Sequence, residues 1–326
     1  MGTRKTKETD YLFASARVRA AENRLIGADK TESAINAKDS SEIEALIGSV
    51  SAPEGSSDRL SAYLGSAYSF IAEISPSEDI ASFLRYSYDC NNIKAALKCH
   101  FRETDCSEML FPFGAVTVDK ILAMPRDLDF SALPKHMSEA AKEAFEAYAK
   151  SGDPQLIDII LDKACYRDML DAARSDDFAY DLVRMKIDLT NIMMCIRIIR
   201  MGGGLSERDV LERSLIEGGY LDRMKLYDSR SENEIAMLLS GSEYSSLSAF
   251  LDDGGKISLA EIERRCDDIY MKKVRTTKSL PFGAPLLCAY LVAVEYEVKN
   301  LRIILAGKRA GLSGEKIRDR VRLGYV

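Results

Sequence analysis

The chain has 326 residues, enough for two or three compact domains, and its 45 basic and 51 acidic residues give a formal net charge of −6. Because the two signs are interspersed and no basic face stands out, this charge pattern argues against a nucleic-acid-binding protein. The seven cysteines have no paired metal-ligand spacing, and several fall on apolar helical faces. They are predicted to be reduced core thiols rather than a disulfide framework.

The composition favours helices. Glycine (20 residues) and proline (8 residues) are scarce, whereas Ala, Leu, Ile, Glu, Lys and Arg dominate. No alternating strand pattern persists over five residues. The longest apolar run, residues 284–294, falls short of the ~20 residues that cross a bilayer. We therefore expect an all-α, soluble protein that can lie beside a membrane but does not span one.

Helical patterns follow one another along the whole chain. The first ends before Gly27, a residue type that is common just after a helix. Pro125 and Pro134 are expected to interrupt a connection, and Pro154 to begin a helix. In chain order, the predicted helices span residues 10–26, 42–47, 58–74, 83–98, 138–150, 155–174, 178–200, 231–239, 245–251, 258–274 and 287–308.

Three of these helices, residues 83–98, 178–200 and 287–308, share one apolar rhythm. Their apolar side chains recur in steps of three and four, as on the buried seam of a packed helix. Each seam also carries an acid followed three residues later by an asparagine, so that the two side chains share one edge. The three pairs are Asp89 and Asn92, Asp188 and Asn191, and Glu297 and Asn300.

These pairs indicate one helical unit that occurs three times. Asn92 and Asn191 are 99 residues apart, and Asn191 and Asn300 are 109 residues apart. Such long periods favour repeated helical domains over a short-repeat solenoid. The predicted domains span residues 1–116, 117–214 and 215–326.

The repeated acid and asparagine are the strongest candidates for selected polar positions. Polar groups that border an apolar seam can satisfy helix-end amides or neighbouring arginines and so fix the register between helices. A role that recurs once per repeat is more naturally architectural than catalytic. The alternative is an enzyme whose three carboxylates converge, and such a site would require a bound metal ion.

A short helix is predicted after each seam. Gly204 and Gly311 are expected to end the second and third seam helices, and a serine two residues later to cap the next helix. Residues 114–117 are a fainter version, later in register. We expect these short helices to contribute to partner-binding surfaces, although the basic cluster around the third also fits a solvated face. The candidate partner-binding residues are Thr117, Ser206, Ser313, Lys316, Arg318 and Arg320.

The sequence shows no catalytic apparatus. The only histidines are His100 and His136, so acid/base or nucleophilic chemistry based on histidine is not expected. Cys99 and Cys106 flank His100, but their spacing is not that of a zinc site, and we interpret them as incidental thiols at a helix end. The glycine-rich segments lack the order of a phosphate-binding loop. We therefore predict no catalytic residue, cofactor or metal.

Several segments resemble the C subunit of prokaryotic V-type (archaeal-type) ATPases, whose eukaryotic relative is the V-ATPase d subunit. Residues 296–304, with the sequence YEVKNLRII, are similar to the C-terminal signature of that family, and residues 16–20 to its N-terminal helix. Residues 188–192 and 217–219 fit as well. The first repeat matches least, with residues 91–94 as its clear core. The resemblance covers essentially the whole chain.

The resemblance implies a fold and a role. Members are all-α, with three similar helical domains in a funnel of pseudo-threefold symmetry, and they are not catalytic. They lie on the cytoplasmic face of the membrane, peripheral to it, between the proteolipid rotor ring and the D and F subunits of the central stalk. They couple rotation to proton or sodium transport. The competing interpretation is a generic helical scaffold or adaptor without a rotor connection.

Overall fold

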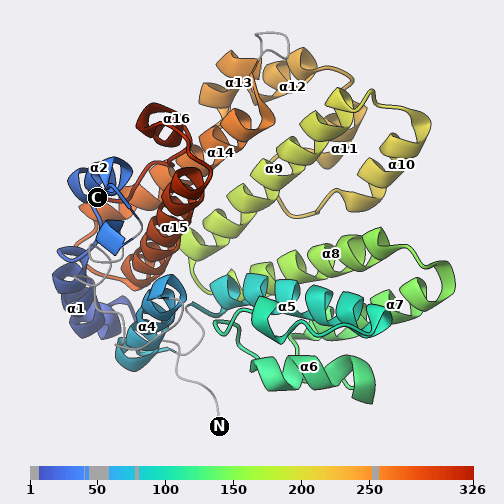
Figure 1. Ribbon diagram of the computed structural model, residues 1–326, viewed down its shortest axis with the longest axis horizontal. Helices are drawn as coiled ribbons and strands as arrows, with labels where there is room; N and C mark the ends of the chain where they lie inside the picture. Colours follow the sequence, from blue (N-terminus) through green and yellow to red (C-terminus); the bar gives the residue numbers. More distant parts are fainter. Residues whose placement is uncertain (1–6, 40, 44–58, 78–80, 252–256) are drawn as a thin grey trace. The chain divides into compact units, whose positions relative to one another are not determined.

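The computed structural model describes residues 7–39, 41–43, 59–77, 81–251 and 257–326. Within these ranges the regular structure consists of helices without any strand (Figure 1), which confirms the predicted all-α class. Three of the elements are short 3-10 helices. They are η1 (Glu8–Tyr11), η3 (Ser107–Met109) and η4 (Thr276–Ser279).

One compact unit joins the N-terminal residues up to 80 to the C-terminal residues from 239 onward. Its central element, α15, contacts α1, α2, α4, α14 and α16. Residues 286–294 of α15 are buried without interruption, as expected for a helix that is apolar all round. The helices of this unit are α1 (Leu12–Glu22), α2 (Ala28–Asn36), α4 (Arg59–Ile74), α13 (Ser245–Leu251), α14 (Leu259–Arg275), α15 (Ala284–Arg309) and α16 (Gly314–Arg318).

The other compact unit spans residues 81–238. In it, α8 contacts α5, α7 and α9, and α5 also contacts α6. Figure 1 shows α5, α6, α7 and α8 as neighbouring helices. The helices of this unit are α5 (Ser82–Arg102), α6 (Val118–Asp127), α7 (Lys135–Ser151), α8 (Pro154–Ala173), α9 (Asp177–Arg200), α10 (Leu205–Ser214) and α11 (Arg223–Asp228), and α12 (Glu232–Leu239) reaches its boundary.

Most predicted helices are found within a few residues of their expected ends. Pro154 occupies the first turn of α8, and Ser258 caps α14 by accepting the N–H of Glu261. The expectation for Pro125 was wrong, because it lies in the last turn of α6, which ends at Leu128 in the left-handed conformation. Residues 44–47 of the predicted helix 42–47 lie outside the described residues. The three domain ranges stay a prediction.

Candidate functional site

The first acid and asparagine lie on α5, and both are fully buried. Asn92 donates from Nδ2 to the C=O of Phe111 (2.8 Å) and accepts the N–H of Phe111 at Oδ1 (2.8 Å). Asp89 accepts the N–H groups of Ala115 and Val116, each at 3.0 Å. This pair, which we call clamp one, therefore holds the loop after η3 against the middle of the preceding seam helix.

The same arrangement recurs on α9. Asn191 donates to the C=O of Ile216 (2.8 Å) and accepts its N–H (2.9 Å). Asp188 accepts the N–H groups of Tyr220 (2.9 Å) and Leu221 (3.1 Å). This pair is clamp two. In both clamps the acid binds the amides four and five residues after the residue that the asparagine binds, so the two loops share one path.

An arginine four residues before each aspartate completes these two clamps. Arg184 donates to the C=O groups of Gly218 (3.2 Å) and Gly219 (2.9 Å). Arg85 donates to the corresponding carbonyls of Phe113 and Gly114. The loop thus receives donors for its carbonyls and acceptors for its amides from a single turn of the seam helix. The sequence pattern did not reveal this arginine because the equivalent position in α15 is Ala293.

A glycine allows each loop to approach its aspartate closely. A Cβ atom built on Gly114 would lie 2.1 Å from Oδ1 of Asp89, and one built on Gly219 would lie 2.0 Å from Oδ1 of Asp188. Real Cβ atoms do not come so close to another heavy atom. The glycine is therefore required by the carboxylate and not by an unusual backbone angle at Gly114.

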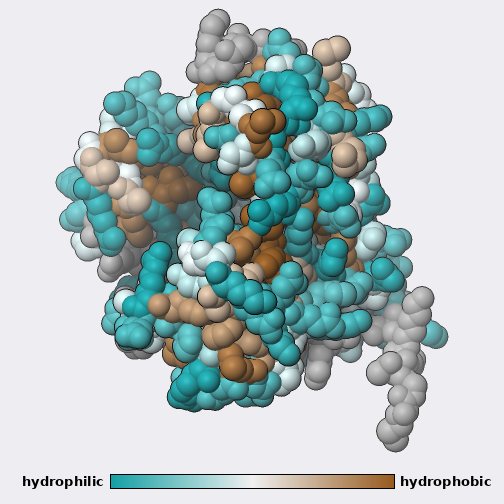
Figure 2. Space-filling model, turned by 90° about the vertical axis from the view of Figure 1, so that its right-hand side faces the viewer, coloured by the Kyte–Doolittle hydropathy of each residue, from teal (hydrophilic) through white to brown (hydrophobic). Residues whose placement is uncertain are grey.

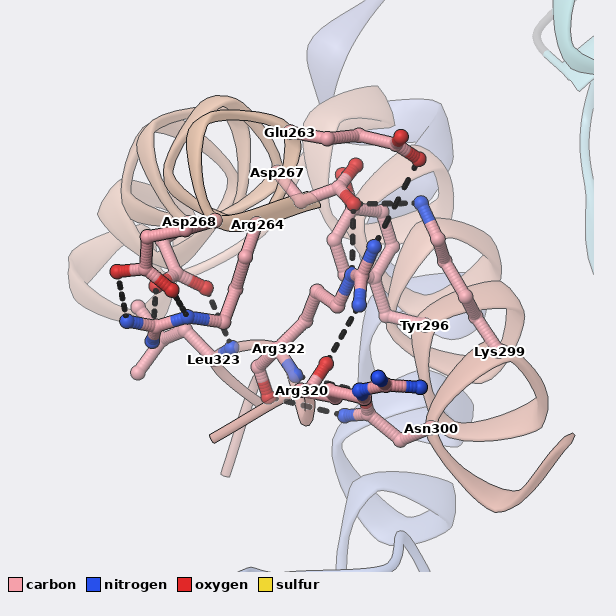
Figure 3. A network of polar contacts seen from close by, with 11 residues as sticks. Glu263, Arg264, Asp267, Asp268, Tyr296, Lys299, Asn300, Arg320, Arg322 and Leu323 are labelled. Atoms are coloured by element: carbon pink, nitrogen blue, oxygen red, sulfur yellow. Dashed lines mark hydrogen bonds and ion pairs between the residues drawn. The ribbon is translucent and has the colours of Figure 1, made fainter. Parts of the chain in front are cut away.

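The third asparagine holds the C-terminal tail, residues 322–326, instead of an internal loop (Figure 3). Asn300 of α15 donates to the C=O of Arg322 (3.0 Å) and accepts its N–H (2.8 Å). Two acids of α14 assist. Asp267 accepts Nε of Arg322 (2.9 Å), and Asp268 accepts the N–H of Leu323 (2.7 Å). The tail is therefore fixed to α14 and α15 together.

The penultimate residue anchors the end of the tail. Tyr325 is almost completely buried, and its C=O accepts Nε of Arg275 (2.9 Å). Its hydroxyl lies 3.1 Å from the hydroxyl of Thr277 and donates to Oε1 of Glu22 (3.1 Å). The tail thus joins α14, η4 and α1, three elements of the same compact unit.

The third acid, Glu297, also binds partners of a different kind from those of Asp89 and Asp188. Glu297 accepts the N–H of Ile26 at Oε1 (2.6 Å) and the hydroxyl of Tyr63 at Oε2 (2.8 Å). Ile26 directly precedes Gly27, the N-cap of α2, and Tyr63 belongs to α4. We call Glu297 and Asn300 clamp three. It joins both chain ends to α15.

Burial changes the acidity of two of these carboxyl groups. It raises the pKa of Asp89 to about 6, although the N–H groups of Val116 and Ala115 oppose the shift. It raises the pKa of Glu297 to about 8, against the hydrogen bonds from Tyr63 and Ile26. Glu297 therefore holds a proton for most of the time at neutral pH.

A cavity of about 300 Å³ lies beside clamp three. Glu297 and Asn300 line it together with the ends of two segments. One segment is Ile26 to Ala28, at the start of α2, and the other is the C-terminal tail, from which Leu323, Gly324 and Val326 line the cavity. The cavity therefore marks the place where the chain ends next to α2.

The candidate partner-binding residues are all exposed. Thr117 is the N-cap of α6, and Ser313 caps α16 by accepting the N–H of Lys316. The prediction for Ser206 was wrong in detail, because the N-cap of α10 is Gly204. The guanidinium of Arg318 pairs with Glu32 of α2, so its charge is already used within the chain.

The register predicted for the first tail was also wrong. The sequence pattern aligns Gly114 with Gly204 and Gly311, which follow the ends of seam helices. Contacts with the aspartates instead pair Gly114 with Gly219. The end of α5 is formed by Glu103, which adopts the left-handed conformation (φ 53°) that a glycine adopts after the other two seam helices.

Two exposed apolar residues were not singled out from the sequence. Met201 is 69% exposed and Leu205 is 93% exposed, and they flank the glycine turn between α9 and α10. Hydrophilic side chains cover most of the face in Figure 2, and apolar ones form separate patches.

Neither a metal site nor a membrane span is found in the described part of the chain. Across those ranges, no cluster of three or more His, Cys, Asp or Glu side chains is arranged to hold a metal ion. No helix there combines the length and the apolar character required to cross a bilayer. His100 is exposed at the end of α5, where its ring packs against Phe101 and Phe145.

The model of the ATP synthase (C/AC39) subunit family matches residues 14–320. The match includes the acid and asparagine of all three clamps, and the C-terminal tail lies just beyond it.

Curated relatives align over most of their length. The C subunit of the A-type ATP synthase of Methanobrevibacter smithii is 26% identical, with 95% of this chain and 87% of the relative aligned. The protein of the same name from Methanosarcina mazei is 25% identical, with 98% and 94% aligned. The C subunit of the V-type sodium ATPase of Enterococcus hirae is 24% identical, with 79% of each chain aligned.

Proposed function

Because the chain belongs to the ATP synthase (C/AC39) subunit family, we propose that it is a non-catalytic central-rotor subunit of a V-type ATPase or ATP synthase. In this role it is a socket on the proteolipid ring, peripheral to the inner face of the cell membrane, and it receives the D and F subunits of the central stalk. It passes rotation between the ATPase head and the transport of protons or sodium ions.

The observation that carries this proposal is the family match over residues 14–320, supported by relatives of the same family aligned along nearly the whole chain. The match does not rest on one seam helix, because α5, α9 and α15 all lie inside it. This extent favours a rotor subunit over a generic scaffold or adaptor that shares one helical pattern.

The clamp geometry favours an architectural role over an enzymatic one. Asp89 and Asp188 are fully buried, and both oxygens of each carboxylate accept backbone N–H groups. Glu297 uses both of its oxygens as well. Carboxylates engaged in this way hold loops in place and are poorly available to a metal or a substrate.

A torque-transmitting subunit has to be stiff. Long buried helices open less readily than loop-built contacts, and each clamp ties a loop to the middle of such a helix. The exposed short helices then offer contact surfaces on a rigid base. The turn with Met201 and Leu205 and the basic residues Lys316 and Arg320 are the surfaces that we assign to partners.

Affinity capture of the tagged chain from native membranes, followed by mass spectrometry, tests the proposal. We expect the proteolipid and the D and F subunits among the recovered proteins. Recovery of the intact, folded chain without any of these proteins in mild detergent would refute the rotor assignment and favour the scaffold.

Surface variants sharpen the same experiment. Lys316→Glu combined with Arg320→Glu, and separately Leu205→Asp, should each reduce recovery of at least one partner. Lys142→Glu, at an exposed position of α7, is the matched control and should recover all partners. Arg318 is avoided because its replacement would break the pair with Glu32. Unchanged recovery with every surface variant would exclude these surfaces.

A further inference from the structure

The three clamps are followed by helices at equivalent positions. Asp89 binds the N–H of Val116, one residue before Thr117, the N-cap of α6. Asp188 likewise binds the N–H of Leu221, one residue before the N-cap of α11. Each clamp therefore sets the start of the helix that follows it.

Clamp three obeys the same rule, but the helix comes from the other end of the chain. Glu297 binds the N–H of Ile26, one residue before Gly27, the N-cap of α2. We propose that α2 takes the place in the third helical unit that α6 and α11 take in the first two. The C-terminal tail, α2 and clamp three then form a latch that closes this unit without a covalent link.

The change from aspartate to glutamate fits this arrangement. In clamps one and two, a glycine lets the loop approach the carboxylate of the shorter acid closely. The residues before Ile26 are Arg24 and Leu25, so clamp three has no glycine at this place. The longer side chain of Glu297 reaches a single amide and the hydroxyl of Tyr63 instead of two amides of one loop.

The tail supplies the other half of the latch. Asn300 binds Arg322 as Asn92 and Asn191 bind Phe111 and Ile216. In clamps one and two the loop then continues into α6 or α11, whereas the segment that holds Arg322 leads to Val326, beside Gly27 at the start of α2. A side-chain atom of Val326 lies 3.6 Å from a Cβ built on Gly27, and the cavity occupies the remaining gap.

The latch is independent of clamps one and two, which lie in the other compact unit. Releasing it should free α2 while the loops before α6 and α11 stay closed. This outcome depends only on intramolecular contacts. It can therefore succeed or fail separately from the proposed rotor function.

Hydrogen exchange of the full-length protein, read by mass spectrometry, tests the latch. Glu297→Asp keeps a carboxyl group but shortens its reach to Ile26, and a chain lacking residues 323–326 removes most of the tail. We expect exchange in residues 27–36 to rise about tenfold or more in both variants. Exchange in residues 118–127 and 223–228 should stay within about twofold of the wild type.

Asn191→Ala is the matched control, because it removes the equivalent side chain from clamp two. It should accelerate exchange around residues 216–228 and leave residues 27–36 unchanged. The latch is refuted if residues 27–36 keep their slow exchange in both latch variants. It is equally refuted if Asn191→Ala accelerates them to the same degree.

A disulfide that joins the tail to α2 should restore slow exchange in a latch variant. It would not do so if the variant had only lost stability in general. Gly27→Cys with Val326→Cys places two thiols where a side-chain atom of Val326 lies 3.6 Å from the position of a Cβ on residue 27. Oxidised in the Glu297→Asp background, this pair should return exchange in residues 27–36 to near the wild-type rate. A disulfide that forms without slowing exchange in α2 would contradict the proposed closure.

Discussion

Clamp two and clamp three both fix a segment of the chain against a seam helix, but the segments come from different distances along the sequence. In clamp two, three side chains of α9 hold the loop between α10 and α11, and the bound residues lie only 25–35 positions further along the chain. In clamp three, two side chains of α15 hold one segment from the N-terminal region and one from the C-terminal region. Ile26, in the first of these, lies 271 residues before Glu297, which binds it. A short loop needs little ordering, whereas distant segments need additional anchors such as Asp268 and Arg275.

The largest expected effect comes from removing the acid of clamp two. Asp188→Ala leaves the N–H groups of Tyr220 and Leu221 without their buried acceptor and should cost about 2–5 kcal/mol of unfolding free energy. Denaturant unfolding measures this loss. An effect below that of a typical surface substitution would show that water replaces the carboxylate without penalty.

The next effect tests the close approach of Gly219 to Asp188, which distinguishes clamp two from clamp three. Gly219→Ala would place a Cβ 2.0 Å from Oδ1 of Asp188, so the loop or the carboxylate has to move, at about 1–3 kcal/mol. Gly314→Ala is the control, because its Cβ would meet Ile35 at an ordinary 3.5 Å. Equal melting temperatures for both variants would contradict the steric argument.

Clamp three should differ from clamp two in its response to pH. The folded protein holds the proton of Glu297 more tightly than the unfolded chain, since burial raises this pKa from 4.5 to about 8. The stabilising contribution of this proton is complete below about pH 4.5 and is lost as the pH rises toward 8. Glu297→Gln removes this titration, so its unfolding free energy relative to wild type should increase across that window.

Asp89→Asn provides the comparison for this measurement. Burial raises the pKa of Asp89 only to about 6. The difference in unfolding free energy between Asp89→Asn and wild type should therefore become constant near pH 6. Unfolding curves between about pH 4.5 and 8.5 separate the two profiles. Identical profiles for both variants would show that these carboxyl groups do not control how the unfolding free energy depends on pH.

The smallest effect is expected from Tyr63→Phe. This change removes one hydrogen bond to Glu297 but preserves the buried ring, and it should cost about 1 kcal/mol. Ser66→Ala on the same helix is the control, because its hydroxyl donates to the backbone C=O of Tyr63 and leaves the carboxyl of Glu297 untouched. A loss as large as that of Asp188→Ala would show that clamp three depends on Tyr63 more than on Ile26.

The seam helices could be predicted from sequence because their apolar residues recur at the helical period. The acid and asparagine on each seam could be predicted as well, since they keep the same spacing in all three repeats. The arginines of clamps one and two could not, because Ala293 breaks their pattern in the third. Nothing local connects Ile26 with Glu297, so the role of α2 becomes visible only in three dimensions.

The position of α2 has a consequence for biosynthesis. Ile26 leaves the ribosome long before Glu297 is made, and at about 5–20 residues per second the 271 intervening residues take roughly 15–50 s. Arg322, which binds Asn300, is made later still, after Glu297. The nascent chain must therefore carry α2 without its docking site until α15 has been made, and α2 docks only after that helix has left the ribosome.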